Sequence, residues 1–253
     1  AGAHILLSPV GTFTAYTRRI EHAGEVRVPA GAINLTVSDN KTTFTQDVSL
    51  KERIYLAPGS RLDAAGERID NSLAGKVAGF SLSFGQTGGG TISIKDQTDQ
   101  GQGVFMETGA VVDVSGGYTI NQKGKVTGGN AGKLSIQGST IMLEGDLRGY
   151  ALADPNGKIQ GGAITLRATN VRVAPTSPAW TDFNAESAVL QDDDTRKGRL
   201  TLAGNRFDDT GFTRITLESF NDVVVDPDTI FSTSLIRLNQ PLPALRPGVA
   251  VPI

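Results

Sequence analysis

Two stretches of the sequence decide the fold that we expect. They read Ile54-Tyr-Leu-Ala-Pro-Gly-Ser-Arg-Leu-Asp-Ala-Ala-Gly66 and Val104-Phe-Met-Glu-Thr-Gly-Ala-Val-Val-Asp-Val-Ser-Gly116. The thirteen positions align without a gap, and both stretches carry a glycine, an aspartate and a second glycine at equivalent places. Short runs in which apolar residues alternate with other residues flank the first shared glycine. This pattern is typical of half-buried β-strands joined by a tight turn.

Related motifs recur elsewhere along the chain. Four segments share the core Gly-x-apolar-Thr/Ser-apolar, and they begin at Gly90, Gly132, Gly162 and Gly198. In a third alignment, residues 164–175 match residues 215–227 once one residue is inserted. Further short alternating runs, such as Phe80-Ser-Leu-Ser-Phe84, are also expected to be strands. Similar motifs at irregular spacing indicate a common coil whose connecting loops vary in length.

A single coil of this kind cannot bury its apolar face alone. Stacking coils ~4.8 Å apart pairs each strand with its equivalent in the next coil and builds a continuous core. The sequence therefore predicts an all-β fold, a parallel β-solenoid with loop insertions, in which coils of roughly 20 to 29 residues would number about ten. Inward side chains should include Val112 or Val114, and Ile164 or Leu166. A β-sandwich is the alternative, but the aligned Asp and Gly positions and the lack of clear two-residue hairpin turns favour the solenoid.

Composition excludes several classes of function. The chain has 253 residues with 24 basic and 26 acidic side chains, which does not give the concentrated basic field of a nucleic-acid binder. It has no cysteine and two histidines, which argues against disulfides, thiol catalysis and cysteine- or histidine-based metal sites. No apolar run approaches the ~18 residues of a membrane span. We therefore expect no cofactor, no bound metal, no nucleic-acid partner and no transmembrane segment.

Three motifs carry a resemblance to a known family. They are Leu-Ala-Pro-Gly-Ser-x-Leu-Asp-Ala-x-Gly at 56–66, Val-Asp-Val-Ser-Gly-Gly at 112–117 and Gly-Gly-x-Ile-x-Leu-x-Ala at 161–168. Together they resemble filamentous haemagglutinin-type exoproteins over roughly residues 50 to 230. The resemblance implies a right-handed parallel β-helix, exported through an outer-membrane transporter by two-partner secretion in Gram-negative bacteria. The secretion signals of that family are not recognisable, so the chain is expected to be an interior stretch of a larger exoprotein or a short relative.

The function that follows is structural and adhesive, at the cell surface or in the secreted state, without catalysis. Expected partners are a host-cell or matrix glycan or protein, or other copies of the chain along a filament. A carbohydrate-active β-helix enzyme, a polysaccharide lyase or hydrolase, is one alternative, and it needs carboxylates that converge on one face. A phage tailspike or surface-layer subunit is another.

One segment departs from the coil pattern. We expect a single β-helix domain at 1–238 with an insertion near 176–198, followed by a Pro-rich extended tail or linker at 239–253. The insertion holds the only tryptophan, and a short helix could run through it to residue 190. It either covers the flank of the solenoid or contacts a ligand, because aromatic rings rimmed by acids can stack on a sugar or a partner. The ligand-contact candidates are Trp180, Phe183, Asp192, Asp193 and Asp194.

Other acidic residues are expected to cap or form turns. Asp63 and Asp113 occupy equivalent positions of the repeat, which indicates a capping role and not catalysis. Asp208 and Asp209 lie in a short polar segment that is expected to be a turn between two strands.

Overall fold

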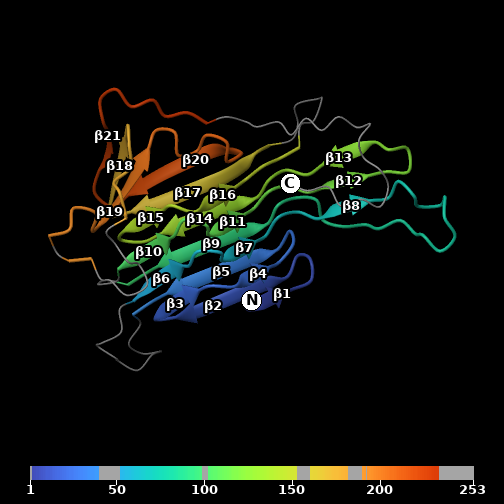
Figure 1. The fold of residues 1–253 in the computed structure, drawn as a ribbon, viewed down its shortest axis with the longest axis horizontal. Coiled ribbons are helices and arrows are strands. Elements are labelled where there is room, and N and C mark those ends of the chain that lie inside the picture. Colours follow the sequence, from blue (N-terminus) through green and yellow to red (C-terminus); the bar gives the residue numbers. More distant parts are fainter. Residues whose placement is uncertain are drawn as a thin grey trace.

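The computed structural model describes residues 2–39, 52–98, 102–152, 160–181, 190–191 and 193–233 (Figure 1). Within these ranges the chain forms strands, turns and extended segments but no helix. The tail predicted at 239–253, the helix proposed within the insertion, and the candidates Phe183 and Asp192 lie outside the described residues. The all-β prediction is confirmed for the part of the chain that the structure describes.

Three parallel sheets make up the body. Sheet A contains, in spatial order, β1 (His4–Leu6), β4 (Glu25–Arg27), β7 (Arg61–Asp63), β11 (Val111–Asp113) and β16 (Asp146–Arg148). Sheet B contains β2 (Thr12–Thr17), β5 (Ala32–Val37), β9 (Thr91–Asp96), β14 (Lys133–Gln137), β17 (Gly162–Ala168) and β20 (Phe212–Ser219). Sheet C contains β3 (Arg19–His22), β6 (Arg53–Leu56), β10 (Gly103–Met106), β15 (Ile141–Leu143), β19 (Arg199–Ala203), β18 (Asn170–Ala174) and β21 (Val223–Val225).

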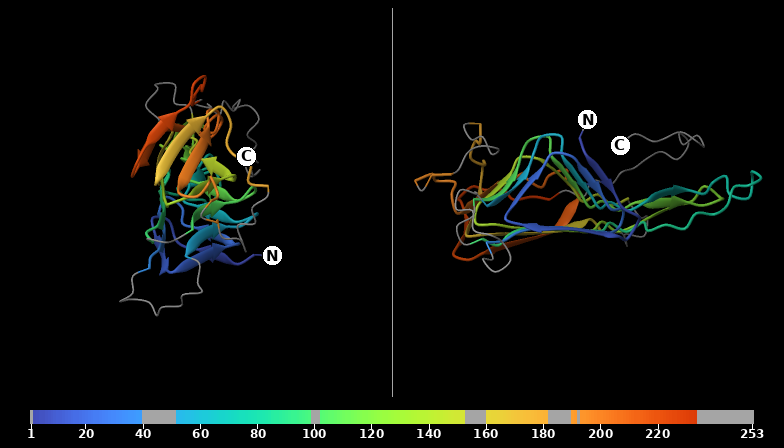
Figure 2. Two further views of the ribbon diagram at one scale, coloured as in Figure 1. Left: turned by 90° about the vertical axis from the view of Figure 1, so that its left-hand side faces the viewer. Right: turned by 90° about the horizontal axis from the view of Figure 1, so that it is seen from below.

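The chain visits sheets B, C and A in turn and then repeats the circuit one place further along. It runs β2–β3–β4, then β5–β6–β7, β9–β10–β11 and β14–β15–β16. The sequence colours accordingly pass from blue at one end of the body to orange at the other (Figures 1 and 2). The parallel pairing within all three sheets excludes the β-sandwich, whose sheets are antiparallel.

The repeats found in the sequence pair with one another in register. Ile54 lies beside Val104 in sheet C, and Asp63 lies beside Asp113 in sheet A, as the first alignment predicts. The alignment of 164–175 with 215–227 is also confirmed, since β17 pairs β20 and β18 pairs β21. The motif that begins at Gly198 is the exception. It forms β19 in sheet C, whereas the motifs that begin at Gly90, Gly132 and Gly162 form sheet B.

Two further sequence predictions are corrected. The estimate of about ten coils is too high, because sheet B has six strands among the described residues. Its first three strands start at Thr12, Ala32 and Thr91, which are 20 and then 59 residues apart, so loop insertions lengthen the later circuits. Residues 80–84 are extended but join no sheet, because only side-chain and isolated backbone contacts hold that segment.

The core lies between the three sheets and consists of stacked aliphatic side chains. The four positions predicted to face inward are all buried, which confirms the alternation; they are Val112, Val114, Ile164 and Leu166. On sheet B, Ile94, Ile136 and Leu166 occupy equivalent positions on neighbouring strands. Because equivalent positions stack, the apolar face of each strand points into the core at every circuit. A short run of alternating residues is therefore enough to supply the buried face of each strand.

A smaller sheet projects from the body. It contains β8 (Arg68–Asp70), β12 (Tyr118–Ile120) and β13 (Val126–Gly128), with β8 parallel and β13 antiparallel to β12. Together with the segments that connect them, residues 67–87 and 117–129, these strands form an arm that extends away from the three sheets (Figures 1 and 2).

Replacing Ile136 by alanine should lower the free energy of unfolding by about 2–5 kcal/mol, the usual cost of a cavity in a packed core. Ile136 is 1% exposed. Its neighbour on β14, Ser135, faces outward, so Ser135→Ala should change stability by no more than about 0.5 kcal/mol. Urea denaturation of both variants measures the difference. Equal losses would mean that the strand alternation has been misassigned.

Candidate functional site: the charged face of sheet A

Sheet A places a regular pattern of charges on the outer surface of the body. Strands β4, β7, β11 and β16 have three residues each, and in every one the middle residue is buried. The first and third residues therefore face outward. The first outward row is Glu25, Arg61, Val111 and Asp146, and the second is Arg27, Asp63, Asp113 and Arg148. The second row therefore has two aspartates side by side, with an arginine at each end.

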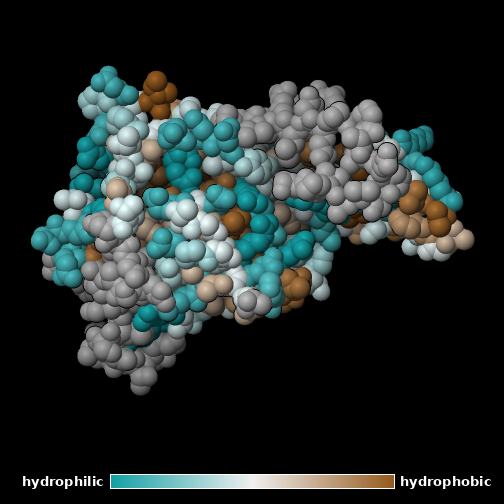
Figure 3. All heavy atoms as spheres, viewed as in Figure 1, coloured by the Kyte–Doolittle hydropathy of each residue, from teal (hydrophilic) through white to brown (hydrophobic). Residues whose placement is uncertain are grey.

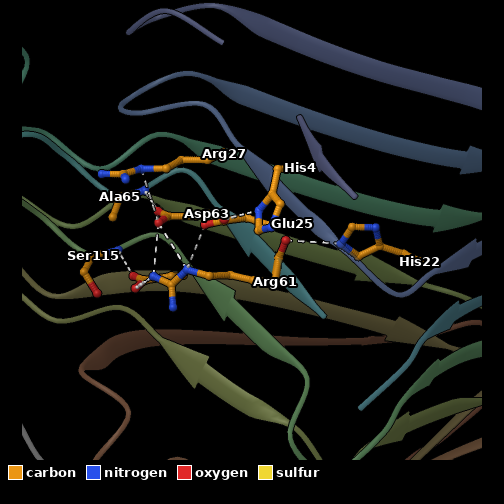
Figure 4. Close-up of polar contacts among 9 residues, drawn as sticks. His4, His22, Glu25, Arg27, Arg61, Asp63, Ala65 and Ser115 are labelled. Atoms are coloured by element: carbon orange, nitrogen blue, oxygen red, sulfur yellow. Dashed lines mark hydrogen bonds and ion pairs between the residues drawn. The ribbon is translucent and has the colours of Figure 1, made fainter. Parts of the chain in front are cut away.

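Arg61 joins the aspartates of this second row (Figure 4). Its Nη2 lies 3.1 Å from Asp63 Oδ2 and 3.0 Å from Asp113 Oδ2. Burial alone would lower the pKa of Arg61, but the two carboxylates, with Glu25, outweigh it and raise that pKa further above its ordinary value. The Arg61 guanidinium thus bridges two buried carboxylates that would otherwise repel each other, and Arg27 lies 3.7 Å from Asp63 on the other side (Figure 4).

The same two aspartates also close turns. The second carboxylate oxygen of Asp63 accepts a hydrogen bond from the Ala65 amide at 2.9 Å, and that of Asp113 accepts one from the Ser115 amide at 2.9 Å. Each aspartate therefore caps the backbone that leaves its strand, which confirms the turn role predicted from their equivalent positions. With both oxygens of each carboxylate engaged, neither aspartate is placed to exchange protons with a substrate.

His22 lies beside this cluster, at the end of β3. Its Nε2 is 3.1 Å from the backbone oxygen of Arg61, which assigns the ring proton to that nitrogen. Burial lowers the pKa of His22 below its ordinary value, and the hydrogen bond to Arg61 only partly offsets this. The folded protein therefore holds His22 neutral at a pH where the unfolded chain binds a proton.

The free energy of unfolding should consequently fall as pH is lowered from about 7.5 through about 6.5, the ordinary histidine pKa. The stability contributed by neutral His22 is present above that value and is lost as pH falls towards the depressed pKa of the folded state. The His22→Gln variant should show a shallower loss in urea titrations at each pH. His4→Gln is the matched control, since His4 is exposed and pairs with Glu25 at 2.9 Å. A variant of His22 that keeps the full slope would contradict this assignment.

A groove of about 730 Å³ lies on sheet A beyond the Arg61 cluster. The turn at 204–211 forms one wall, and Arg206 fixes this turn by donating to the backbone oxygens of Leu143 and Gly145 at 3.1 and 2.6 Å. On the same wall Tyr150 donates its hydroxyl to the backbone oxygen of Asp209 at 2.6 Å. Both side chains are partly shielded from water, and this burial raises the pKa of Tyr150 and lowers that of Arg206.

Other side chains of the groove are more exposed or more weakly bonded than Arg206 and Tyr150. Arg68 at the base of the arm is exposed, and Tyr118 opposite Arg68 on β12 is half-buried. Arg148 pairs with the exposed Asp146 at a long 3.4 Å. These four side chains come from sheet A and the arm and converge on one hollow.

The groove carries no net charge among its described lining residues. Four arginines (Arg61, Arg68, Arg148 and Arg206) face four aspartates (Asp113, Asp146, Asp208 and Asp209). A polyanion needs an excess of cations, which this site lacks. A balanced set of donors and acceptors beside two tyrosine rings suits a neutral ligand rich in hydroxyl groups. Such a ligand accepts hydrogen bonds from the arginines, donates hydrogen bonds to the aspartates and stacks its apolar face on the rings.

The candidates Trp180 and Asp194 lie elsewhere, over sheet C. Trp180 packs edge-on against Phe105 with the ring centroids 6.3 Å apart, and Arg196 lies over the same indole at 4.8 Å. Asp194 binds the Arg196 guanidinium at 2.8 Å, and this hydrogen bond lowers the pKa of Asp194. Asp193 is exposed. Of the five candidates, the structure thus brings Trp180 and Asp194 together through Arg196.

The described part of the insertion covers an outward apolar row of sheet C. That row consists of Tyr55, Phe105 and Met142, and it is closed by Leu190 and by the half-buried Trp180. The amide of Leu190 is anchored on Gln102 at 3.0 Å. These contacts favour the role of a structural cover, while contact with a ligand stays a prediction for the exposed edge of the segment.

Trp180→Ala should therefore lower the free energy of unfolding by roughly 1–3 kcal/mol, less than the ~3–5 kcal/mol of a fully buried aromatic residue. Phe84→Ala is the control, because Phe84 is 91% exposed and should be neutral. Thermal unfolding compares the two variants. Unchanged stability in Trp180→Ala would restore the insertion as the leading contact surface.

Comparison of the chain with protein-family models, with curated proteins and with solved structures finds no match. Within the described ranges no helix is both long and apolar enough to cross a bilayer. The same residues include no cluster of three or more histidine, aspartate or glutamate side chains placed to hold a metal ion. The case for a function therefore depends on the geometry of the groove and on the sequence motifs.

Sequence reasoning missed this groove. The offset of fifty residues that aligns Asp63 with Asp113 also aligns Arg68 with Tyr118, so extending the alignment would have found the base of the arm. The opposite wall, the turn at 204–211, has no counterpart in this alignment. It depends on a turn with positive φ at Asp209 and Gly211.

Proposed function

We propose that the chain is a right-handed parallel β-helix with loop insertions, part of a filamentous haemagglutinin-type exoprotein. In this proposal an outer-membrane transporter exports it by two-partner secretion, and it acts at the cell surface or in the secreted state. Support comes from the repeated circuits through three parallel sheets and from the motifs at 56–66, 112–117 and 161–168. Stacked coils supply reach and rigidity, and they allow further copies to join along a filament.

The adhesive contact in this proposal is the groove on sheet A, and its ligand is a glycan chain. The observation that carries the proposal is the convergence of Tyr118 and Tyr150 with balanced arginines and aspartates in one open hollow. Tyrosine rings and charged hydrogen-bonding groups on a rigid sheet bind a polyhydroxyl chain at low entropic cost, since little has to be ordered.

The carboxylates of the groove are better suited to binding a glycan than to cleaving one. Asp113 is engaged by Arg61 and by the Ser115 amide, and Asp208 accepts from the Ser232 hydroxyl at 2.7 Å. A glycoside hydrolase or lyase needs a pair of carboxyl groups free to donate and accept protons. The presence of four aspartates in one groove nevertheless makes a carbohydrate-active enzyme the second candidate.

Substitution of groove residues should weaken glycan binding and leave the fold intact. Tyr118→Ala and Arg148→Ala should each weaken the glycan selected from an array by about tenfold or more, the scale of one lost contact residue in a binding site. Tyr16→Ala on β2 and Arg214→Ala on β20 are the matched controls, and should bind like the parent chain. Isothermal titration calorimetry measures the affinities, and circular dichroism checks the fold.

Two results would overturn the adhesive assignment. Equal binding by groove variants and controls would place the contact elsewhere. Release of reducing ends or unsaturated products from the bound glycan, abolished in Asp209→Asn, would identify an enzyme.

A further inference from the structure

The arm holds residues 83–86 in a fixed position although these residues join no sheet. The Asn71 side chain bridges Ser83, donating to its backbone oxygen at 2.9 Å and accepting from its amide at 2.8 Å. Glu67 holds Gln86 in a similar way, by a backbone bond of 2.7 Å and a side-chain bond of 2.8 Å. Residues 83–86 therefore run along the edge of β8. Residues 70–84, together with the turn at 121–125, are the end of the arm.

This end of the arm exposes apolar side chains. Val77 is 53% exposed, Phe80 41%, Leu82 47% and Phe84 91%. Phe80, Leu82 and Phe84 alternate along an extended segment, so their side chains share one side of it. Figure 3 shows hydrophobic residues gathered at the far end of the arm, beyond the mostly hydrophilic body. Grouped apolar residues at a projecting end mark a contact surface.

Basic residues accompany these apolar side chains. Lys76, Lys123 and Lys125 are exposed at the two turns that end the arm. The turns are neighbours, since a Cβ built on Gly75 would lie 3.3 Å from Gln122 Nε2. Residues 70–84 and 121–125 hold these three lysines and one acid, Asp70, which gives +2, whereas the whole chain carries −2. The net charge of the end of the arm is thus opposite in sign to the net charge of the whole chain.

We propose that the arm docks on the surface of a lipid bilayer that contains anionic lipids. Phe80, Leu82 and Phe84 enter the interface, and the lysines contact headgroup phosphates. Apolar side chains bordered by lysines are the combination that interfacial segments use, and the long lysine stems let the charge reach the headgroups while the stem stays apolar.

The composition of the surface favours a bilayer over a protein partner. A standard protein interface needs ~20–30 residues on each side, with tyrosine, tryptophan or arginine anchors at its centre. The end of the arm is a narrow projection whose anchors are phenylalanine, leucine and valine, none of which has a hydrogen-bonding group. The charge of +2 selects a negative surface, such as that of an anionic bilayer.

Vesicle binding tests the proposal with the full chain. Flotation with phosphatidylcholine vesicles that contain phosphatidylglycerol should carry the protein, and pure phosphatidylcholine should carry much less. Added salt should weaken the binding, because it screens the lysines. Phe84→Ser should reduce the partition coefficient by about tenfold, on the scale of one apolar side chain withdrawn from the interface. Replacing Lys123 and Lys125 by alanine should remove the preference for anionic vesicles.

Matched controls distinguish vesicle binding by the arm from nonspecific binding by other exposed side chains. Ile230→Ser removes another highly exposed apolar side chain, at 82%, and Lys133→Ala removes a lysine from sheet B; both should bind vesicles like the parent chain. All variants should keep the parent melting temperature, since these side chains are exposed. The proposal fails if no vesicle is bound, or if the arm variants and the controls bind alike. It also fails if Phe84→Ser changes the molar mass in solution and not the vesicle binding, because the surface would then join two copies of the chain.

Discussion

The structure depends on one constraint, which is that every circuit of the chain must return to each sheet in the same register. A slip of one residue would turn the buried row Ile94, Ile136 and Leu166 to the outside, so register is enforced by burial. The same constraint stacks outward residues as strictly as inward ones. It places Asp63 beside Asp113, an arrangement of like charges that is unfavourable in an isolated sheet. Arg61 resolves this conflict, and the charged face from which the groove is built follows directly from the register.

How far the sequence predicts the fold depends on how much each motif specifies. The alignment of 54–66 with 104–116 covers two strands and the turn between them, and it gave the pairing residue by residue. The motif at Gly198 covers one strand only, and its alternation cannot distinguish sheet B from sheet C. Residues 80–84 show strand alternation without a neighbouring backbone to pair with. A short alternating run therefore predicts an extended conformation, whereas a longer repeat also predicts the partner.

The candidate site was harder to predict for a related reason. Asp63 and Asp113 were recognised as equivalent, and their turn-capping role followed from that equivalence. Their link through Arg61 depends on side-chain reach across strands, which an alignment does not contain. The wall at 204–211 depends on Arg206 reaching backbone oxygens some sixty residues earlier in the chain. The insertion was recognised because it breaks the repeat, but a break in a pattern does not distinguish a cover from a contact surface.

The order of strands in sheet C has a consequence for how the chain acquires its structure. From β3 to β15 each new strand is laid beside the previous one, but β19 lies between β15 and β18 although it comes later in the sequence. A growing stack can add coils one at a time from its first end, as repeat proteins do. In sheet C such addition stops at β15, because β18 finds its neighbour only when residues 199–203 have arrived. The last strands of sheet C, β18, β19 and β21, must therefore assemble together, which delays completion of that sheet until nearly all of the described chain is available.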